Sequence, residues 1–438
     1  MITKLKVENF KSIGENCNPI EFKPLTIFVG WNASGKSNIL ESLCVLAQAT
    51  KMQERTLNKS LLNGEFFKYP EPYTDFISNK RDKNKWISIE IHIKPNESED
   101  KEFLADYSYP SSIDSIGYKY SYLPKDNSVI QSLFINDEKL IEVEYVNNIK
   151  KFTFPKEFER LFPGDDIRSI LNRYIFTYSV PDDYDIGGKK EYLDSISSLA
   201  SKMVEIIEKK LSNVYFISAL RGGLPLVEPT AGTGGPPTWV GKDGEKLIEL
   251  LSLIFGKREY EEKASKIVKW SEKFGISKIK AGWWGGNILG SDYLDPELKT
   301  SLNLILSSQG SRQVLTLITQ LFWSHPESII LIEEPEISLH PESQIELQKM
   351  FAEVIKDGKQ VIYTTHSTFL LLALSELVRE NLLQADSIAV YHVEKDEKGT
   401  SVKPLSINEQ GYIEGWIPSY LKVEEELFGN WVESLEEV

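Results

Sequence analysis

The sequence predicts an α/β protein built around a parallel sheet, and two observations lead to this fold class. A glycine-containing loop starting at Gly30 lies between a predicted strand and a predicted helix. Far along the chain, the apolar run that begins at Ile329 ends in two adjacent carboxylates, Glu333 and Glu334. Short runs that are apolar throughout are typical of strands covered on both faces, as in a parallel sheet.

The loop reads Gly-Trp-Asn-Ala-Ser-Gly-Lys-Ser and fits the pattern Gly-x-x-x-x-Gly-Lys-Ser. Consecutive backbone N–H groups and a helix N-terminus can wrap a phosphate closely at this spacing. The alternative is a glycine-containing turn with a chance lysine, and the flanking strand (19–29) and helix (38–43) favour the phosphate loop. The expected nucleotide-binding residues are Gly30, Trp31, Asn32, Ala33, Ser34, Gly35, Lys36, Ser37 and Asn38.

The segment from Ile329 to Pro341 predicts a buried strand with acids at its carboxyl end. Two carboxylates there are costly unless something uses their negative charge, and a magnesium ion with a nucleophilic water would do so. The alternative is a strand that leaves the core through an acidic turn.

The composition is that of a globular protein with a large core. The chain has 438 residues, of which 41% are hydrophobic and 26% charged. No apolar run approaches the length of a membrane helix and the start does not resemble a signal peptide, so we expect a cytoplasmic protein with no membrane association. The net charge of −15 gives nucleic-acid binding no support, and two cysteines exclude a disulfide framework.

The element pattern suggests three segments. Residues 1–150 hold the phosphate loop and alternating stretches typical of an antiparallel sheet, including 86–94. Residues 151–300 form a helical and loop insertion, and residues 301–438 carry the acidic strand. The first and last segments are expected to form one head.

Several features of the middle and the tail have two interpretations. Residues 191–211 predict an amphipathic helix. Arg221, after the predicted strand 214–218, is a candidate phosphate or interface contact, although a surface arginine is the commoner outcome. The glycine-rich loop 222–244 is a mobile functional element or a linker. We expect a tight turn with two tryptophans at 282–286, and a terminal strand pair followed by an acidic helix near 423–438.

Two further polar groups stand at the ends of predicted elements. Ser308 and Gly310 open an apolar helix, where a hydroxyl and free N–H groups form either a second anion site or a plain helix cap. His366 follows the predicted strand 360–365, at the edge where ligands of open α/β sheets bind. A lone histidine is usually structural, and its position here favours a functional role.

The order of these motifs resembles that of the ABC-type P-loop ATPases, in the branch of the SMC, RecF and OLD-family proteins. Asn9-Phe10-Lys11-Ser12 looks like the opening strand of these families, and Glu333-Glu334-Pro335-Glu336 with Leu339-His340-Pro341 is typical of OLD-like ATPases. The resemblance covers roughly residues 1–43 and 306–373. It implies an ABC-type head with a mixed central sheet, an antiparallel β lobe and a helical middle insertion.

The resemblance also implies roles for individual residues. Lys36 and Ser37 would bind phosphate and Mg²⁺, with Glu333 as the acid on the magnesium side and Glu334 polarising the attacking water. His366 would sense the γ-phosphate. Three further contacts to ATP would come from Lys11 and, in trans, from Ser308 and Gly310 of a partner protomer. ATP and Mg²⁺ are thus the expected ligands, in an ATP-dependent homodimer.

The sequence departs from the family pattern at two places. The glutamine expected after the phosphate-loop helix is missing near Asp75, and Ser308-Gln309-Gly310 replaces the commoner Ser-Gly-Gly. The tail after residue 387 is too short for a Toprim nuclease domain, so no intrinsic nuclease is expected.

Three functions compete. The leading hypothesis is an ATP-driven dimerisation switch in DNA processing, repair or antiviral defence, with DNA and a separately encoded nuclease or other effector as candidate partners. The DNA part rests on the resemblance alone. The alternatives are the ATPase subunit of a membrane transporter and a nucleotide-dependent scaffold with little turnover.

Overall fold

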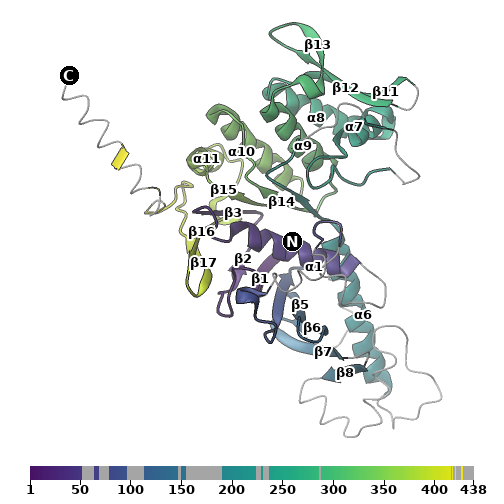
Figure 1. The fold of residues 1–438 in the computed structure, drawn as a ribbon, viewed down its shortest axis with the longest axis vertical. Coiled ribbons are helices and arrows are strands. Elements are labelled where there is room, and N and C mark those ends of the chain that lie inside the picture. The colour runs from purple at the N-terminus through teal and green to yellow at the C-terminus, as the bar shows by residue number, and fades with distance from the viewer. Residues whose placement is uncertain are drawn as a thin grey trace. The chain divides into compact units, whose positions relative to one another are not determined.

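The computed structural model describes residues 1–51, 64–68, 78–95, 113–146, 149–153, 190–222, 228–229, 236–285, 288–415, 417, 420 and 426–427. The chain divides into two compact units, whose elements are labelled in Figure 1. The first unit comprises Met1–Phe22, Asn38–Val214 and Lys395–Val402. The second comprises Lys23–Ser37, Tyr215–Glu394 and Lys403–Val438. Residues 151–300, expected as one insertion, therefore contribute to both units.

The first unit contains a seven-stranded antiparallel sheet in the order β2-β1-β4-β5-β6-β7-β8. Its strands are β1 (Ile2–Glu8), β2 (Ile20–Glu21), β4 (Ile87–Ile93), β5 (Ile116–Leu123), β6 (Ser128–Ile135), β7 (Glu138–Val146) and β8 (Ile149–Thr153). The isoleucines at positions 87, 89, 91 and 93 are all buried, as their period of two predicts. The helices are α1 (Lys36–Lys51), which starts in the second unit, and α6 (Lys190–Ser212).

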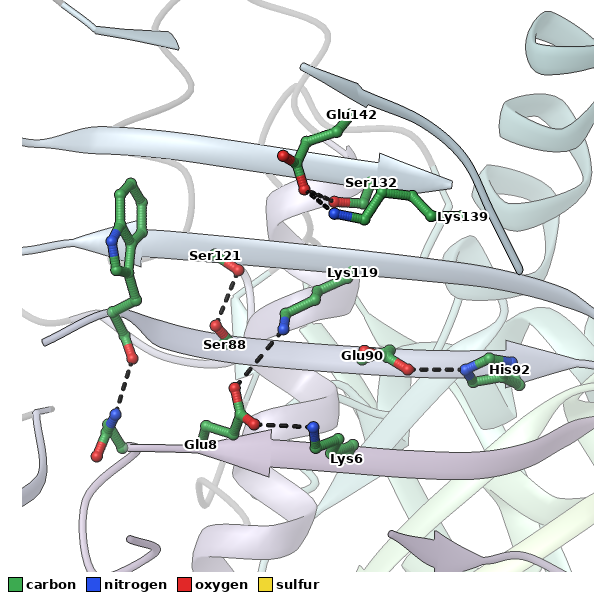
Figure 2. A network of polar contacts seen from close by, with 12 residues as sticks. Lys6, Glu8, Ser88, Glu90, His92, Lys119, Ser121, Ser132, Lys139 and Glu142 are labelled. Carbon is green, nitrogen blue, oxygen red and sulfur yellow. Dashed lines mark hydrogen bonds and ion pairs between the residues drawn. The ribbon is translucent and has the colours of Figure 1, made fainter. Parts of the chain in front are cut away.

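The side chains that alternate with these isoleucines, together with their neighbours on the adjacent strands, form a row of paired charges (Figure 2). Lys6 Nζ lies 2.9 Å and Lys119 Nζ 3.6 Å from carboxylate oxygens of Glu8, and Glu90 contacts the buried His92 at 2.9 Å. Ser132 and Lys139 share the Glu142 carboxylate in the same way. Because these lysines have carboxylate partners, this row offers little net positive charge to a nucleic-acid backbone.

The second unit is organised by a six-stranded sheet in the order β17-β16-β3-β15-β14-β9, whose strands other than β9 are labelled in Figure 1. Its strands are β3 (Leu25–Gly30), β9 (Val214–Ile217), β14 (Ile329–Glu333), β15 (Gln360–Thr365), β16 (Ile388–Asp396) and β17 (Gly399–Leu405). Residues of β17 up to Val402 are assigned to the first unit. The pairs β14–β15, β15–β3 and β3–β16 are parallel. The fully buried β15 confirms the strand predicted at 360–365, and β3, which is also fully buried, forms the last part of the strand predicted at 19–29.

Helices and a smaller sheet complete the second unit. The helices are α7 (Leu247–Gly256), α8 (Glu261–Lys273), α9 (Gln309–Trp323), α10 (Pro341–Lys356) and α11 (Thr368–Arg379). The smaller sheet consists of β10 (Glu228–Pro229), β11 (Ser277–Gly285), β12 (Ile288–Asp295) and β13 (Thr300–Asn303). Leucines and isoleucines of α7, α9, α10 and α11 share one core cluster with β3, β14 and β15.

Two local predictions are wrong. Residues 19–29 do not form one strand, because Lys23-Pro24 separates β2 from β3 and the two strands enter different sheets. Gly282 and Trp283 lie in β11, where they pair with Gly290 and Leu289, so the expected tight turn is instead a strand with a register shift beside Trp283. That tryptophan is 65% exposed.

The remaining expectations have mixed outcomes. The amphipathic helix and the terminal strand pair are confirmed as α6 and as β16 with β17. The region around Asp75 lies outside the described residues, as do nearly all of the expected acidic helix and much of the loop 222–244. Among the described helices, none has the length and apolar character that crossing a bilayer requires.

Candidate nucleotide site

The carboxyl ends of three neighbouring strands meet at one edge of the six-stranded sheet. Glu333 at the end of β14 is in register with Thr364 of β15, and Thr365 is in register with Val29 of β3. The residues that follow these strands are therefore neighbours. The structure thus brings together the phosphate loop, the two acids and His366, which the sequence suggested separately.

The phosphate loop approaches the backbone of β16 closely at its first residue. A Cβ atom on Gly30 would lie 2.1 Å from the carbonyl oxygen of Val393, and Gly30 has a φ of +155°. Ala33 and Gly35 also have positive φ values, +60° and +106°. The loop therefore curls tightly before α1 begins at Lys36, so that the first N–H groups of this 16-residue helix close the loop.

Lys36 is buried inside this loop. Its Nζ donates hydrogen bonds to the carbonyl oxygens of Gly30 and Trp31, both at 2.9 Å. Burial lowers the pKa of Lys36 to about 8, although the carboxylates of Glu334 and Glu336 favour its charged form. The ammonium group is thus already desolvated at the place where a phosphate would be held.

We expect ATP affinity to fall as pH rises through the pKa of Lys36. Bound phosphates favour the charged lysine, so above pH 8 binding must also add a proton to Lys36, whereas below pH 8 the proton is already present. At pH 9 the affinity should be about tenfold lower than at pH 7.5. Equilibrium titration with fluorescent ATP at several pH values measures this change.

Lys36→Arg is the matched control, because a guanidinium keeps its proton over this range and its ATP affinity should not change with pH. The same pH dependence in the Arg variant would contradict the assignment to Lys36.

The acid turn, residues 333–336, leaves the sheet with an unusual backbone. Glu334 has a φ of +42°, and its N–H donates to the carbonyl oxygen of Thr364 at 3.0 Å. A non-glycine residue with a left-handed backbone conformation destabilises the fold by about 1–2 kcal/mol, so neighbouring contacts must maintain the conformation of Glu334. The turn places the Glu334 carboxylate, 3.9 Å from Nε2 of His366, on the site rather than in the core.

His366 is held through its backbone on both sides. Its N–H donates to Oε1 of Glu336 at 2.9 Å, and its carbonyl oxygen accepts from the Tyr420 hydroxyl at 3.2 Å. Burial, together with the nearby Lys36, lowers the pKa of His366, so the imidazole is neutral at pH 7. Burial also raises the pKa of Glu336. Neither Glu336 nor Tyr420 was anticipated from the sequence as a contact of the histidine.

Ser308 caps α9, as the simpler of the two interpretations predicted. Its side chain accepts a hydrogen bond from the N–H of Ser311 at 3.0 Å, and it remains exposed. Gly310 is buried, and a Cβ there would lie 2.4 Å from the carbonyl oxygen of Ser338 in the turn after Glu336. The structure therefore ties the start of α9 to the acid turn of the same chain. A contact with ATP from a partner protomer remains a prediction.

Two predicted nucleotide contacts belong to the first unit. Lys11, with a φ of +52°, forms an ion pair with Glu41 of α1. The side-chain amide of Asn38 donates to Ser12 Oγ at 2.6 Å. These contacts attach the segment after β1 to α1, and a role in nucleotide binding remains a prediction for both residues.

Arg221 is neither a surface residue nor positioned by its contacts as a phosphate ligand. It is 1% exposed, and its guanidinium donates to the carbonyl oxygens of Glu333 (2.9 Å), Glu334 (3.1 Å) and Pro335 (2.9 Å). The sequence interpretation that favoured a surface arginine is therefore wrong. The only available signal was its position directly after a buried strand, and the carbonyls it binds lie more than 110 residues away.

The residues present fit ATP and Mg²⁺. The positive φ values of Ala33 and Gly35 curl the loop in front of α1, as a loop that admits a phosphate requires, and Ser37 is exposed at the start of that helix. A hydroxyl together with the Glu333 carboxylate supplies the oxygen ligands that Mg²⁺ prefers.

Comparisons with known proteins place most of the chain in one family. The family model AAA_21, described as "AAA domain, putative AbiEii toxin, Type IV TA system", matches residues 25–373. The DNA replication and repair protein RecF of Francisella tularensis subsp. mediasiatica (strain FSC147) is 29% identical over 106 residues, which are 22% of this chain and 30% of that protein. The match thus spans less than a third of RecF.

Solved structures that resemble the chain include SMC heads. The SMC head domain from Thermotoga maritima has 12% identity and a TM-score of 0.40, covering 93% of this chain and 99% of its own. The SMC head with an extended coiled coil derived from Pyrococcus furiosus, bound to the C-terminal domain of ScpA, has 14% identity and a TM-score of 0.45, covering 97% and 99%.

Proposed function

The chain belongs to the AAA_21 family of SMC/RecF-like, ABC-type P-loop ATPases, and from this premise we propose that it binds ATP with Mg²⁺ and hydrolyses it. The observation that carries the proposal is the meeting of Lys36, Glu334 and His366 at the edge of one parallel sheet. Phosphoryl transfer needs groups that position and neutralise charge, and this edge supplies them.

Each group has a distinct task in this proposal. Lys36 and the N–H groups at the start of α1 hold the phosphates, while Ser37 and Glu333 hold Mg²⁺. Bound Mg²⁺ would neutralise charge on the phosphate oxygens. Glu334, whose carboxylate faces the site, orients the attacking water and favours loss of its proton. The neutral His366 donates or accepts a hydrogen bond near the γ-phosphate.

The proposal includes an ATP-dependent homodimer in which Ser308 and Gly310 complete the site of the partner protomer. Its support is the exposed serine at the N-terminus of the 15-residue helix α9, where N–H groups and the helix dipole favour an anion. The likeness to RecF, a DNA replication and repair protein, supports a role in DNA processing. The proposal adds a separately encoded effector and a role in defence, to which the family description contributes only the mention of a putative toxin of a type IV toxin–antitoxin system.

A mixing experiment tests hydrolysis and the shared site together. Wild-type protein should release phosphate from ATP, whereas Lys36→Ala and Ser308→Arg should each be inactive. A heterodimer of the two variants has one intact site, with the loop from one protomer and the helix from the other. Equal mixing should therefore restore about a quarter of wild-type turnover, because half of the dimers are mixed and half of their sites work.

The matched control mixes Lys36→Ala with Glu334→Gln. Both changes lie on the loop side of the site, so every mixed dimer lacks an intact site and no activity should return. A wild-type protein without Mg²⁺-dependent phosphate release would refute hydrolysis. Heterodimers that form, by light scattering, but stay inactive would refute the shared site.

A further inference from the structure

The guanidinium of Arg221 donates to backbone carbonyl oxygens of the acid turn and not to its carboxylates. Its two terminal nitrogens donate to three successive carbonyl oxygens of the turn, and Nη1 also donates to Ser218 O at 3.1 Å. Burial lowers the pKa of Arg221 to about 10, so the guanidinium is charged at pH 7. Three carboxylates, of Glu333, Glu334 and Glu336, favour that charge without bonding to it.

Three successive carbonyls can face one guanidinium only if the chain bends, and Glu334 supplies the bend through its positive φ. The peptide on one side of this residue is held by Thr364, and the peptide on the other side is held by Arg221. The direction of the Glu334 side chain follows from these two anchors. Hydrogen bonds to a charged group are stronger than those between neutral groups, so the bonds from Arg221 offset the strained backbone of Glu334.

Arg221 is itself anchored in the second unit. Ser218 N–H donates to Lys242 O at 2.9 Å, and Gly222 N–H donates to Asp243 O at 3.0 Å. The Ser218 hydroxyl also bonds to the Asp243 carboxylate. The arginine therefore projects from a fixed segment at the end of β9, the strand beside β14, and does not need to order itself when the site is used.

From this geometry we propose that Arg221 is a positioning residue for hydrolysis, which aims the Glu334 carboxylate and compensates the charge of the acid turn without occupying the oxygens that Mg²⁺ and water need. The proposal rests on the ATPase function above. It separates nucleotide binding from turnover, because Lys36 donates to Gly30 and Trp31 of the phosphate loop, whereas Arg221 donates to the acid turn.

Arg221→Lys and Arg221→Gln test this role in the full-length protein. Lysine keeps the charge but loses the planar fork, and glutamine loses both. We expect kcat to fall at least about tenfold in the Lys variant and further in the Gln variant, with the Kd for ATP within about twofold of wild type. Arg379→Lys, on the exposed end of α11, is the matched control and should hydrolyse ATP like wild type.

Amide hydrogen exchange measures the order of the acid turn directly and does not depend on hydrolysis. Residues 334–339 should exchange faster in Arg221→Lys than in wild type or Arg379→Lys, while β4 and β5 exchange unchanged. Wild-type turnover in Arg221→Lys, a parallel loss of ATP binding, or unchanged exchange in the turn would each overturn the proposal. If wild type itself hydrolyses no ATP, the proposed function fails, whereas the exchange data still decide whether Arg221 holds the turn.

Discussion

Glu334→Gln should lower steady-state ATP hydrolysis by at least about 100-fold, since a positioned general base contributes a factor of this size or more. The amide has the shape of the carboxylate but cannot accept a proton from water. The backbone of residue 334 is held by Thr364 and Arg221, neither of which contacts its side chain through these bonds, so the turn should keep its conformation. Affinity for ATP should therefore stay within about twofold.

Three measurements check this expectation: phosphate release, equilibrium ATP binding, and light scattering with ATP. The last should show more dimer than in wild type, because unhydrolysed ATP keeps the shared site closed. Glu297→Gln, in the exposed turn between β12 and β13, is the matched control and should hydrolyse ATP at the wild-type rate. Undiminished turnover in Glu334→Gln would remove Glu334 from the chemistry.

Gly30→Ala should destabilise the second unit and abolish ATP binding. The added Cβ would lie 2.1 Å from the carbonyl oxygen of Val393, an atom of the backbone that is paired in register with residue 30. This clash can be relieved only if β3 or β16 shifts, and the φ of +155° at residue 30 adds backbone strain for any residue with a side chain. Overpacking and backbone strain together predict a loss of at least about 2 kcal/mol.

Chemical unfolding followed by tryptophan fluorescence measures this loss, and titration with ATP measures the binding. Gly256→Ala is the matched control: it lies at the end of α7, and a Cβ there would meet nothing within 4 Å. Its stability should change by no more than about 0.5 kcal/mol. Equal unfolding midpoints for the two variants would show that the close approach of Gly30 to Val393 is not needed for stability.

The local pattern of the chain was enough to predict the elements of the site. The phosphate loop could be recognised because its glycines and lysine are close in sequence, between a strand and a helix. Strand β14 could be recognised from the apolar run that precedes Glu333, and β15 from the β-branched and aromatic residues at its centre, Val361, Ile362 and Tyr363. Ser308 capping was one of two interpretations, and the local hydrogen bond to Ser311 confirms it without testing the predicted contact with ATP.

Long-range contacts were not predictable in this way. Lys23-Pro24 separates β2 from β3, but only the partners of each strand show that the two enter different sheets. The glycines around Trp283 suggested a turn, but glycine also occurs beside bulges in strands. The pairing of Gly282 and Trp283 with β12 shows that these two residues lie in such a strand.

The phosphate loop, the buried strands and the acids that follow them could be predicted from residues that are neighbours in the chain. Three contacts became visible only in the folded chain: Arg221 binds the turn at Glu333–Pro335, Glu336 holds the backbone of His366, and Gly30 faces Val393. These contacts join segments whose register no local pattern specifies, and burial of a polar group is favourable only once its distant partner is in place.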